Sequence, residues 1–235
     1  AQMLTELSEQ KHPGGLEVIM AILSNYSPAS YVQMKVECPV SDLKGNNDKM
    51  SGEQIAGRFK KAVEIANQSV SRAVTNNKGV MNGVDAVVIA TGNDFRAIEA
   101  GAHAFSVTRG RTTSLSSCEI ENNQFVFRLT IPLALGTIGG LTSLHPLASR
   151  ALQLLGNPSA RDLMKIVAAV GLASNFGAIR SLVTTGIQKG HMKLHLENIL
   201  MSLNVDEKMK QKIKAYFKDR QVSYSMVKAF IEGEL

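Results

Sequence analysis

Alternating apolar and polar residues predict the strands of this chain. From Tyr31 to Cys38 every second side chain is apolar, which is typical of a strand with one face in water. The mostly apolar stretch from Val18 to Leu23 is interpreted as an earlier strand. The runs Ser114–Ile120 and Phe125–Ile131 are joined by four polar residues, so they predict a hairpin with large apolar side chains on one face.

Apolar residues spaced three and four positions apart predict the helices. Ser51, with Gln54 three positions later, begins a helix through a capping box. The proline-free, alanine-rich stretch from Asn82 to Phe105 predicts one long central helix. Its first half is apolar nearly all round, so we expect it to be buried. Further along, Pro146 opens a short helix and Ser159 caps a longer one.

The two ends of the chain differ from this middle part. Beyond Gly190 we expect three short, charged, amphipathic helices, at about 192–203, 206–217 and 223–232. Residues 1–10 read as the end of a helix without an N-cap, which predicts that the chain belongs to a longer protein. Together the elements predict an α+β fold, a large mixed domain around a buried central helix with a helical C-terminal part.

Charge narrows the class of partner. A net charge of +6 and a sequence pI near 9.3 imply an anionic partner. Charge alone leaves nucleic acid, a membrane surface and a phosphorylated small molecule open, so a basic nucleic-acid or anionic-surface binding module is the alternative class. Binding of single-stranded nucleic acid would be expected to use a basic stretch interleaved with aromatic residues. The chain has no such stretch and no tryptophan.

The two cysteines indicate the compartment. Cys38 and Cys118 lie far apart and have no metal-binding spacing. We interpret them as free thiols in a reducing compartment, which predicts a cytoplasmic protein. No run of roughly 20 apolar residues predicts a membrane span, and the polar start lacks the pattern of a signal peptide.

Candidate chemistry centres on a lysine and an aspartate. Lys78 stands in the glycine- and asparagine-rich stretch 75–83, interpreted as a loop, and Asp94 follows the apolar run 86–90. Lysine and aspartate are rarely buried unless they are paired or functional, so these two indicate a site or, alternatively, a structural ion pair.

The separation of the two residues constrains the fold. If a helix begins at Asn82, Asp94 lies about 18 Å along its axis. Lys78 then meets Asp94 only if the loop folds back, and the alternative is a helix that begins nearer Gly92. The sequence leaves both open.

Several motifs must be read together. They are Asn77–Asp85, Ala90–Asp94, Glu99–Ala104, Gly136–Gly140, Ala168–Ala173 with Asn175, Thr185–Gln188 and Gln188–His195. In their order and separations they resemble the bacterial (class II) 3-hydroxy-3-methylglutaryl-CoA (HMG-CoA) reductases, over nearly the whole chain from about Asn25. Two departures are visible. Asn76 stands where the family has histidine, and Ser69-Val70-Ser71 precedes Arg72 where the family has Asp-Pro-Tyr.

The resemblance implies an oxidoreductase that reduces HMG-CoA to mevalonate and CoA in two hydride transfers, with NADPH or NADH as cofactor. It also implies a homodimer. The family's catalytic glutamate and nicotinamide-binding motif lie upstream of Ala1, so an upstream segment or chain is an expected partner. By the same resemblance, residues 1–27 end a small cofactor-binding domain, 28–187 form the large catalytic domain and 188–235 form a C-terminal flap. Neither nucleic acid nor a membrane is then an expected partner.

The resemblance assigns three catalytic residues. The Lys78 ammonium would stabilise the oxyanion, Asp94 would hold and tune that lysine, and His191 on the flap would protonate the departing CoA thiolate. His195 lies four residues after His191, but no third ligand is evident, so no metal site is expected.

By the resemblance, Arg72 and Asn82 match family positions that contact the hydroxymethylglutaryl end, and the alternative for each is an ordinary loop hydrogen bond. Gly139 and Gly140 allow close backbone approach to a bound substrate, although a plain tight turn uses the same residues.

Overall fold

The computed structural model describes Glu6 and residues 19–46, 48–108, 110–184, 186–217, 220 and 222–233. For residues 187–194 it describes the backbone without side chains. The helix predicted over residues 1–10 lies outside these ranges except for Glu6. The described part is α+β, as the pattern of the sequence predicts.

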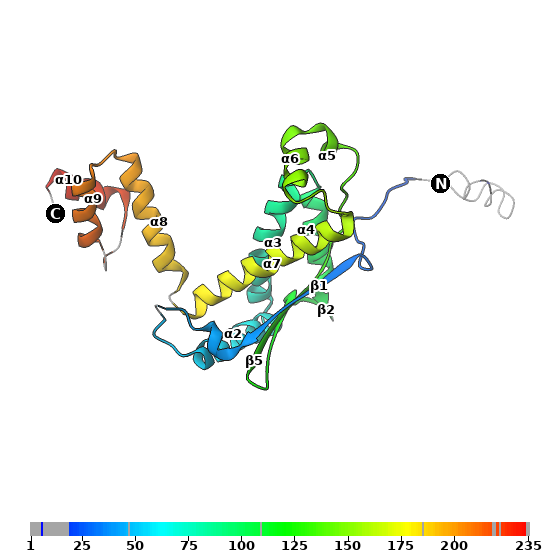
Figure 1. Cartoon of the computed structure of the whole chain (residues 1–235), viewed down its shortest axis with the longest axis horizontal. Helices are drawn as coiled ribbons and strands as arrows, with labels where there is room; N and C mark the ends of the chain where they lie inside the picture. The colour runs from blue at the N-terminus through cyan, green and yellow to red at the C-terminus, as the bar shows by residue number, and fades with distance from the viewer. Residues whose placement is uncertain are drawn as a thin grey trace.

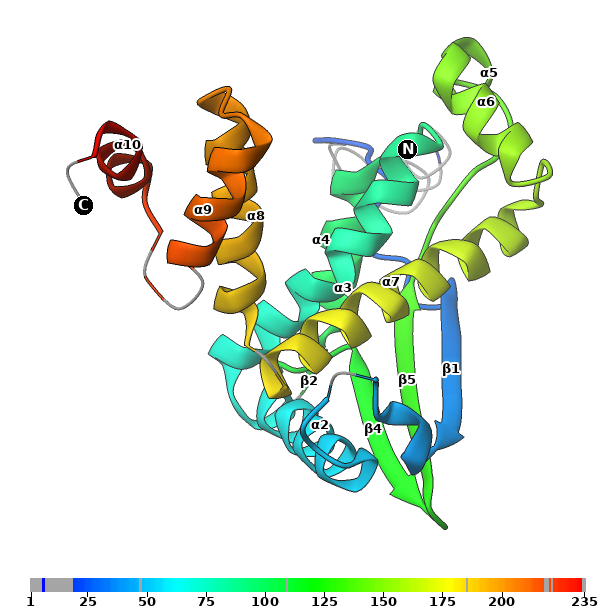
Figure 2. The ribbon, with the colours of Figure 1, turned by 60° about the vertical axis from the view of Figure 1, so that its left-hand side comes forward.

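The larger sheet has three antiparallel strands in the order β1–β5–β4; Figure 1 labels β1 and β5, and Figure 2 shows all three side by side. Their bounds are Tyr31–Pro39 for β1, Ser116–Glu121 for β4 and Gln124–Pro132 for β5. The predicted hairpin is confirmed, because β4 and β5 pair in register from Glu121–Gln124 outward. Asn122 and Asn123 form its turn with positive φ angles of 49° and 61°, a conformation that asparagine tolerates better than most residues.

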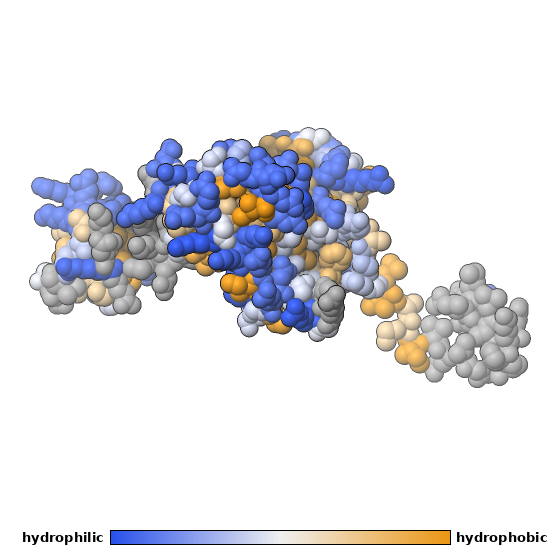
Figure 3. Space-filling view, turned by 90° about the horizontal axis from the view of Figure 1, so that it is seen from below, coloured by the Kyte–Doolittle hydropathy of each residue, from blue (hydrophilic) through white to orange (hydrophobic). Residues whose placement is uncertain are grey.

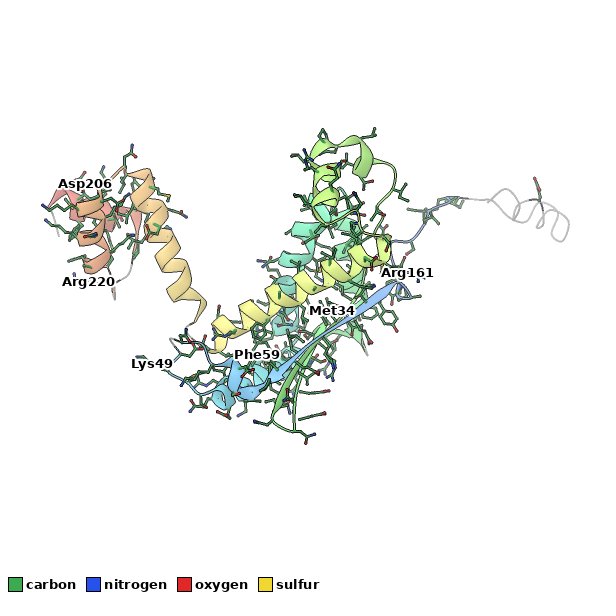
Figure 4. All side chains as sticks on the ribbon, in the orientation of Figure 1. Met34, Lys49, Phe59, Arg161, Asp206 and Arg220 are labelled. Atoms are coloured by element: carbon green, nitrogen blue, oxygen red, sulfur yellow. The ribbon has the colours of Figure 1, made fainter. Side chains whose placement is uncertain are left out.

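One face of the sheet packs against helices through aromatic side chains. Phe125 and Phe127 of β5 are buried, and both contact Phe59 with ring centroids 5.1 and 5.0 Å apart. Phe59 belongs to α2 (Gly52–Gln68), and Figure 4 places it where α2 meets the sheet. Phe176 of α7 (Ala160–Val183) completes the cluster, 5.3 Å from Phe59. The predicted apolar face is therefore the centre of the core.

Local capping signals fix several helix ends as the sequence predicts. Ser51 and Gln54 form the capping box of α2, Ser159 accepts a hydrogen bond from the Asp162 N–H at the start of α7, and Pro146 is the first residue of α6. The remaining short elements are η1 (Val40–Leu43), β2 (Val107–Thr108), β3 (Arg111–Thr112), α5 (Leu141–Leu144) and α6 (Pro146–Leu154).

The central helix is where the sequence-based prediction was wrong. Helix α3 spans Val70–Ala90, so the stretch 75–83 is helical rather than a loop. A turn at 91–93 then separates α3 from α4 (Phe95–Phe105), where one continuous helix was predicted. Gly92 has a φ of 72°, which a helix cannot accommodate, and Asp94 caps the new helix by accepting from the Ala97 N–H.

Helices α3 and α7 pack closely against each other (Figure 2). A Cβ at Gly83 would stand 2.6 Å from the Val170 carbonyl oxygen, and one at Gly171 would stand 2.8 Å from Val84 Cγ2. Helix α7 is long and apolar enough to cross a membrane by length and composition, although no such span was predicted. A core helix passes the same test, and these contacts place one face of α7 in the core.

The apolar stretch 19–23 is not a strand, which corrects the prediction for Val18–Leu23 in its described part. Its large side chains are 73–93% exposed, and no strand in the described ranges pairs with it. Figure 3 shows apolar atoms along the extended segment that leads away from the body. An extended segment becomes a strand only when a neighbour satisfies its backbone groups, and the described part of the chain places no strand beside it.

The C-terminal helices have a second apolar core. They are α8 (Ile187–Ser202), α9 (Glu207–Tyr216) and α10 (Tyr224–Glu232). The bounds of α9 and α10 lie within one residue of the prediction, whereas α8 begins five residues before its predicted start. Leu200, Ile213 and Val227, one from each helix, are fully buried together. Figure 1 shows this group joined to the body at the end of α7.

Candidate functional site

Lys78 stands on the outward face of α3. Helical spacing puts it on the same face as Val74, Asn82 and Ile89, all of which are exposed. Lys78 makes no ion pair with any residue in the described ranges. Its ammonium is therefore available to a ligand or to another chain.

The inward face of the same turn is held by a buried polar network. Asn76, Ser116 and Asn175 are each at most 4% exposed. The Asn76 amide donates to the hydroxyls of Ser114 and Ser116 at 2.8 and 3.1 Å, and the Asn175 amide donates to the Asn76 backbone oxygen at 3.0 Å. Helix α3, helix α7 and strand β4 thus meet directly behind Lys78.

Asn77 ties this turn to the chain that enters β4. Its amide donates to the Thr113 carbonyl oxygen at 2.8 Å, and its side-chain oxygen accepts from the Leu115 N–H at 2.9 Å. Asn77 is fully buried, so both hydrogen bonds lie in a dry environment, where an unpaired amide would be costly. The residues that suggested a loop therefore hold the helix in place.

Asp94 lies at the turn between α3 and α4, close to the glycine-rich segment 136–140. The Asn93 side chain accepts from the Gly136 N–H at 2.9 Å. A Cβ at Gly92 would stand 3.5 Å from the backbone of Leu141. Gly139 and Gly140, with φ angles of 78° and 54°, immediately precede Leu141. The structure therefore brings Asp94 and the two predicted glycines into one region.

A hollow of about 600 Å³ opens at this turn. Its lining residues include Asn25, Asp94, Arg96 and Leu141. It carries one carboxylate and one guanidinium on an otherwise mostly apolar surface. Such a mixture suits an amphipathic ligand, or the covering surface of a second chain.

Lys78 and Asp94 do not meet within this chain. Twelve residues of helix separate Lys78 from Ala90, about 18 Å along the axis, and α4 begins only after that. Neither of the two arrangements left open by the sequence places them in contact. A new helix does begin near Gly92, but Lys78 is itself helical and cannot fold back.

The other predicted residues are spread over the fold. Arg72 is half-buried in the first turn of α3, which Ser69 caps by accepting from the Arg72 N–H at 3.4 Å. Asn82 stands one turn beyond Lys78 on the exposed face. His191 is in α8, and its side chain lies outside the described residues. His195 is exposed. The described residues contain no group of three side chains that could hold a metal ion.

Asp85 and Glu99 form a carboxyl pair that the sequence analysis missed. Burial and the neighbouring charge of Glu99 raise the pKa of Asp85 to about 6. The Asp85 Oδ1 atom is buried without a hydrogen-bond donor in the described ranges. Asp85 and Glu99 each lie several residues from the turn at 91–93, so two helices joined by that turn would bring them together. The prediction of one continuous helix gave no reason to expect this contact.

The chain belongs to the hydroxymethylglutaryl-coenzyme A reductase family. The model of that family matches residues 1–196. Among curated relatives, the 3-hydroxy-3-methylglutaryl-coenzyme A reductase of Archaeoglobus fulgidus is 37% identical over 93% of this chain and 49% of its own length. A probable reductase of the same name from Borreliella burgdorferi is 36% identical over 88% of this chain and 46% of its own length. The chain spans about half the length of the curated relatives it matches.

Solved structures agree with this family. One of the Streptococcus pneumoniae 3-hydroxy-3-methylglutaryl-CoA reductase covers 92% of this chain and 51% of its own, with 38% identity and a TM-score of 0.68. Another, of the class II enzyme of that species bound to NADPH in open conformations, covers 70% of this chain and 45% of its own, with 42% identity and a TM-score of 0.66.

Proposed function

We propose that this chain is the large-domain and flap part of an NAD(P)H-dependent reductase that converts HMG-CoA to mevalonate and CoA. The whole reaction consumes two NAD(P)H and two protons, and releases mevalonate, CoA thiol and two NAD(P)⁺. The observation that carries the proposal is Lys78, an exposed cation on a turn held from behind by buried side chains, in a chain of this family. The division into residues 1–27, 28–187 and 188–235 is part of the proposal.

The chemical task of Lys78 follows from its placement. Reduction of the thioester carbonyl leaves negative charge on its oxygen, and a fixed ammonium stabilises that oxyanion far better in a covered site than in water. Asn82, one turn away on the same face, and Arg72, near the start of α3, would hold the hydroxymethylglutaryl end. Gly139 and Gly140, beside Asp94, would let the backbone approach the substrate closely.

Among the residues that the structure describes, the glycine-rich segment does not by itself form a dinucleotide site. The glycine-rich segment after β5 leads into α5, which has only four residues and so presents too short a helix to bind a pyrophosphate. We therefore assign cofactor binding to the part of the protein that the resemblance places upstream. NADPH and NADH both remain candidates, and His191 is assigned to protonate the CoA thiolate.

A homodimer would bring Lys78 and Asp94 together. Both side chains are exposed and they lie too far apart to meet in one copy, so Asp94 of a second copy is the proposed neighbour of Lys78. Exposed apolar side chains near both residues support a covering partner. Val74 lies one turn before Lys78 on α3, and Ile89 lines the hollow at the Asp94 turn. Leu144 in α5 and Leu147 in α6 are both more than 70% exposed.

The charge of the chain gives little support to a nucleic-acid binding module. Two lysines of α9 are already paired, Lys210 with Glu207 and Lys214 with Glu197.

Cys38 and Cys118 are free, and burial raises the pKa of the Cys118 thiol to about 12, so that thiol stays protonated and inert. Free thiols fit the proposed cytoplasmic location.

The test uses the full-length protein, including the upstream segment. We expect it to oxidise two NAD(P)H for each HMG-CoA, and Lys78→Ala to lower turnover roughly a hundredfold or more, as loss of an oxyanion-stabilising donor does. Lys165→Ala is the matched control, because Lys165 is another exposed helical lysine and is paired with Asp162. A Lys78→Ala enzyme within tenfold of the parent would contradict the assignment.

A further inference from the structure

We propose that Asn175, on α7, is a positioning residue for Lys78, fixing the turn of α3 from which the ammonium projects. This inference rests on the proposed function. It adds a residue that never touches the substrate and acts only through the backbone of the neighbouring helix.

The turn that carries Lys78 needs such support. Residues 75–83 contain three asparagines and two glycines, which are among the weaker helix formers, so the local sequence gives this part of α3 little preference for the helical state. The outward face offers no compensation, because Lys78 and Asn82 are exposed there. The position of this turn therefore depends on contacts made by its inward face.

Asn175 makes those contacts with every polar atom of its side chain. Its amide nitrogen donates to the Asn76 backbone oxygen at 3.0 Å and to the Asn76 side-chain oxygen at 3.2 Å. Its oxygen accepts from the Ser116 hydroxyl at 2.8 Å. Asn175 is 1% exposed, so water cannot replace these partners.

Ser174, the residue before Asn175 on α7, makes a further hydrogen bond to the Lys78 turn. Ser174 donates its hydroxyl to the Gly79 carbonyl oxygen at 2.9 Å. The two α3 carbonyls held from α7, those of Asn76 and Gly79, therefore stand on either side of Lys78 in the sequence. A Cβ on Gly79 would lie 3.3 Å from the Asn175 nitrogen, so α3 approaches this amide with no side chain between them.

This arrangement fixes the base of a long, flexible side chain. The Lys78 ammonium has no ion pair in the described ranges that could set its position. Its placement against the thioester oxygen then depends on where the α3 backbone holds its Cα. A displacement of about 1 Å can lower a catalysed rate on the order of a hundredfold, even when the change lies away from the chemistry.

The experiment compares two variants of the full-length enzyme. Asn175→Asp keeps the size of the side chain but replaces the donating nitrogen with an oxygen that faces two acceptors on Asn76. We expect kcat to fall roughly tenfold to a hundredfold, while KM for HMG-CoA stays within about threefold. Asn175→Ser, a smaller and uncharged change, provides the same measurement if the aspartate variant folds poorly.

Asp48→Asn is the matched structural control. It weakens the ion pair between Asp48 and Arg180, which lies on α7 five residues beyond Asn175 and also donates to the Leu43 carbonyl oxygen. Its kcat should equal that of the parent at a temperature where both are folded. A loss of kcat in the Asn175 variants no larger than in this control would overturn the inference.

A double variant separates positioning from general stability. If Asn175 acts only through Lys78, adding Asn175→Asp to Lys78→Ala should lower the single-turnover rate by less than about twofold. Losses that multiply would overturn the inference alone. A parent enzyme that fails to reduce HMG-CoA would instead overturn the proposed function, and the inference with it.

Discussion

The turns that carry Lys78 and Asp94 are built in opposite ways. The Lys78 turn is a weak helical sequence whose buried Asn76 bonds to residues of two other elements, Ser116 of β4 and Asn175 of α7. The Asp94 turn is held mostly by local signals, the positive φ of Gly92 and the N-cap formed by Asp94 itself. The proposed site therefore combines a lysine whose position depends on residues distant in the sequence with an aspartate whose position is set by its own neighbours.

The same comparison explains what the sequence could predict. Capping and alternation are local, so the ends of α2 and α7 and the β4–β5 hairpin were predicted from residues such as Ser51 and Ser159. The motif resemblance found the family and named the candidate residues. It did not reveal that Lys78 is helical, because that follows from contacts with α7 and β4 which no window of local sequence contains.

His191 adds a group from a third element, helix α8, and its replacement should have the largest effect of the variants described below. His191→Gln in the full-length enzyme should slow reduction of HMG-CoA roughly a hundredfold, but hardly slow reduction of added mevaldehyde, a step in which no thiolate leaves. Lys78→Ala should slow both steps. Turnover on the two substrates, with His195→Gln as the control, measures the difference.

Equal losses on both substrates in His191→Gln would assign His191 a binding or structural role. The control is useful because His195 is exposed and lies on the same helix, four residues further along. It should leave both rates near those of the parent.

The next largest effect is on the free energy of unfolding, which substitutions in the Lys78 turn should lower more than substitutions in the Asp94 turn. Asn77→Ala removes two buried hydrogen bonds and leaves a cavity, so we expect the free energy of unfolding to fall by about 3 kcal/mol. Asp94→Ala removes the local N-cap bond to the Ala97 N–H at an exposed site and should cost about 1 kcal/mol. Denaturant unfolding of both variants gives the comparison, and equal costs would contradict the distinction between long-range and local support.

The smallest effect concerns the carboxyl pair near the Asp94 turn. The pKa of Asp85 is about 6 in the folded protein and has an ordinary value of 3.8, so between these pH values the folded state binds more protons than the unfolded state. Stability therefore falls as pH rises through this window. Asp85→Asn should raise Tm at pH 8 by about 2–4 °C, and this gain should vanish near pH 4.

Thermal scans across that range test this sign directly. Glu121→Gln, at the exposed end of β4, is the control and should not change the pH dependence. A gain for Asp85→Asn that is constant with pH would show that the carboxyl charge is not its cause.

The measurement that tests the central claim most directly is complementation between two inactive copies. If Lys78 of one copy acts with Asp94 of the other, a mixed dimer of Lys78→Ala and Asp94→Asn chains retains one intact site. An equal mixture should then recover about a quarter of the parent activity, because about half of its dimers are mixed. Mixed dimers of the parent with a chain carrying both substitutions should have no active site. No recovery in the first mixture, or a mixed dimer in the second that keeps one active site, would contradict the account.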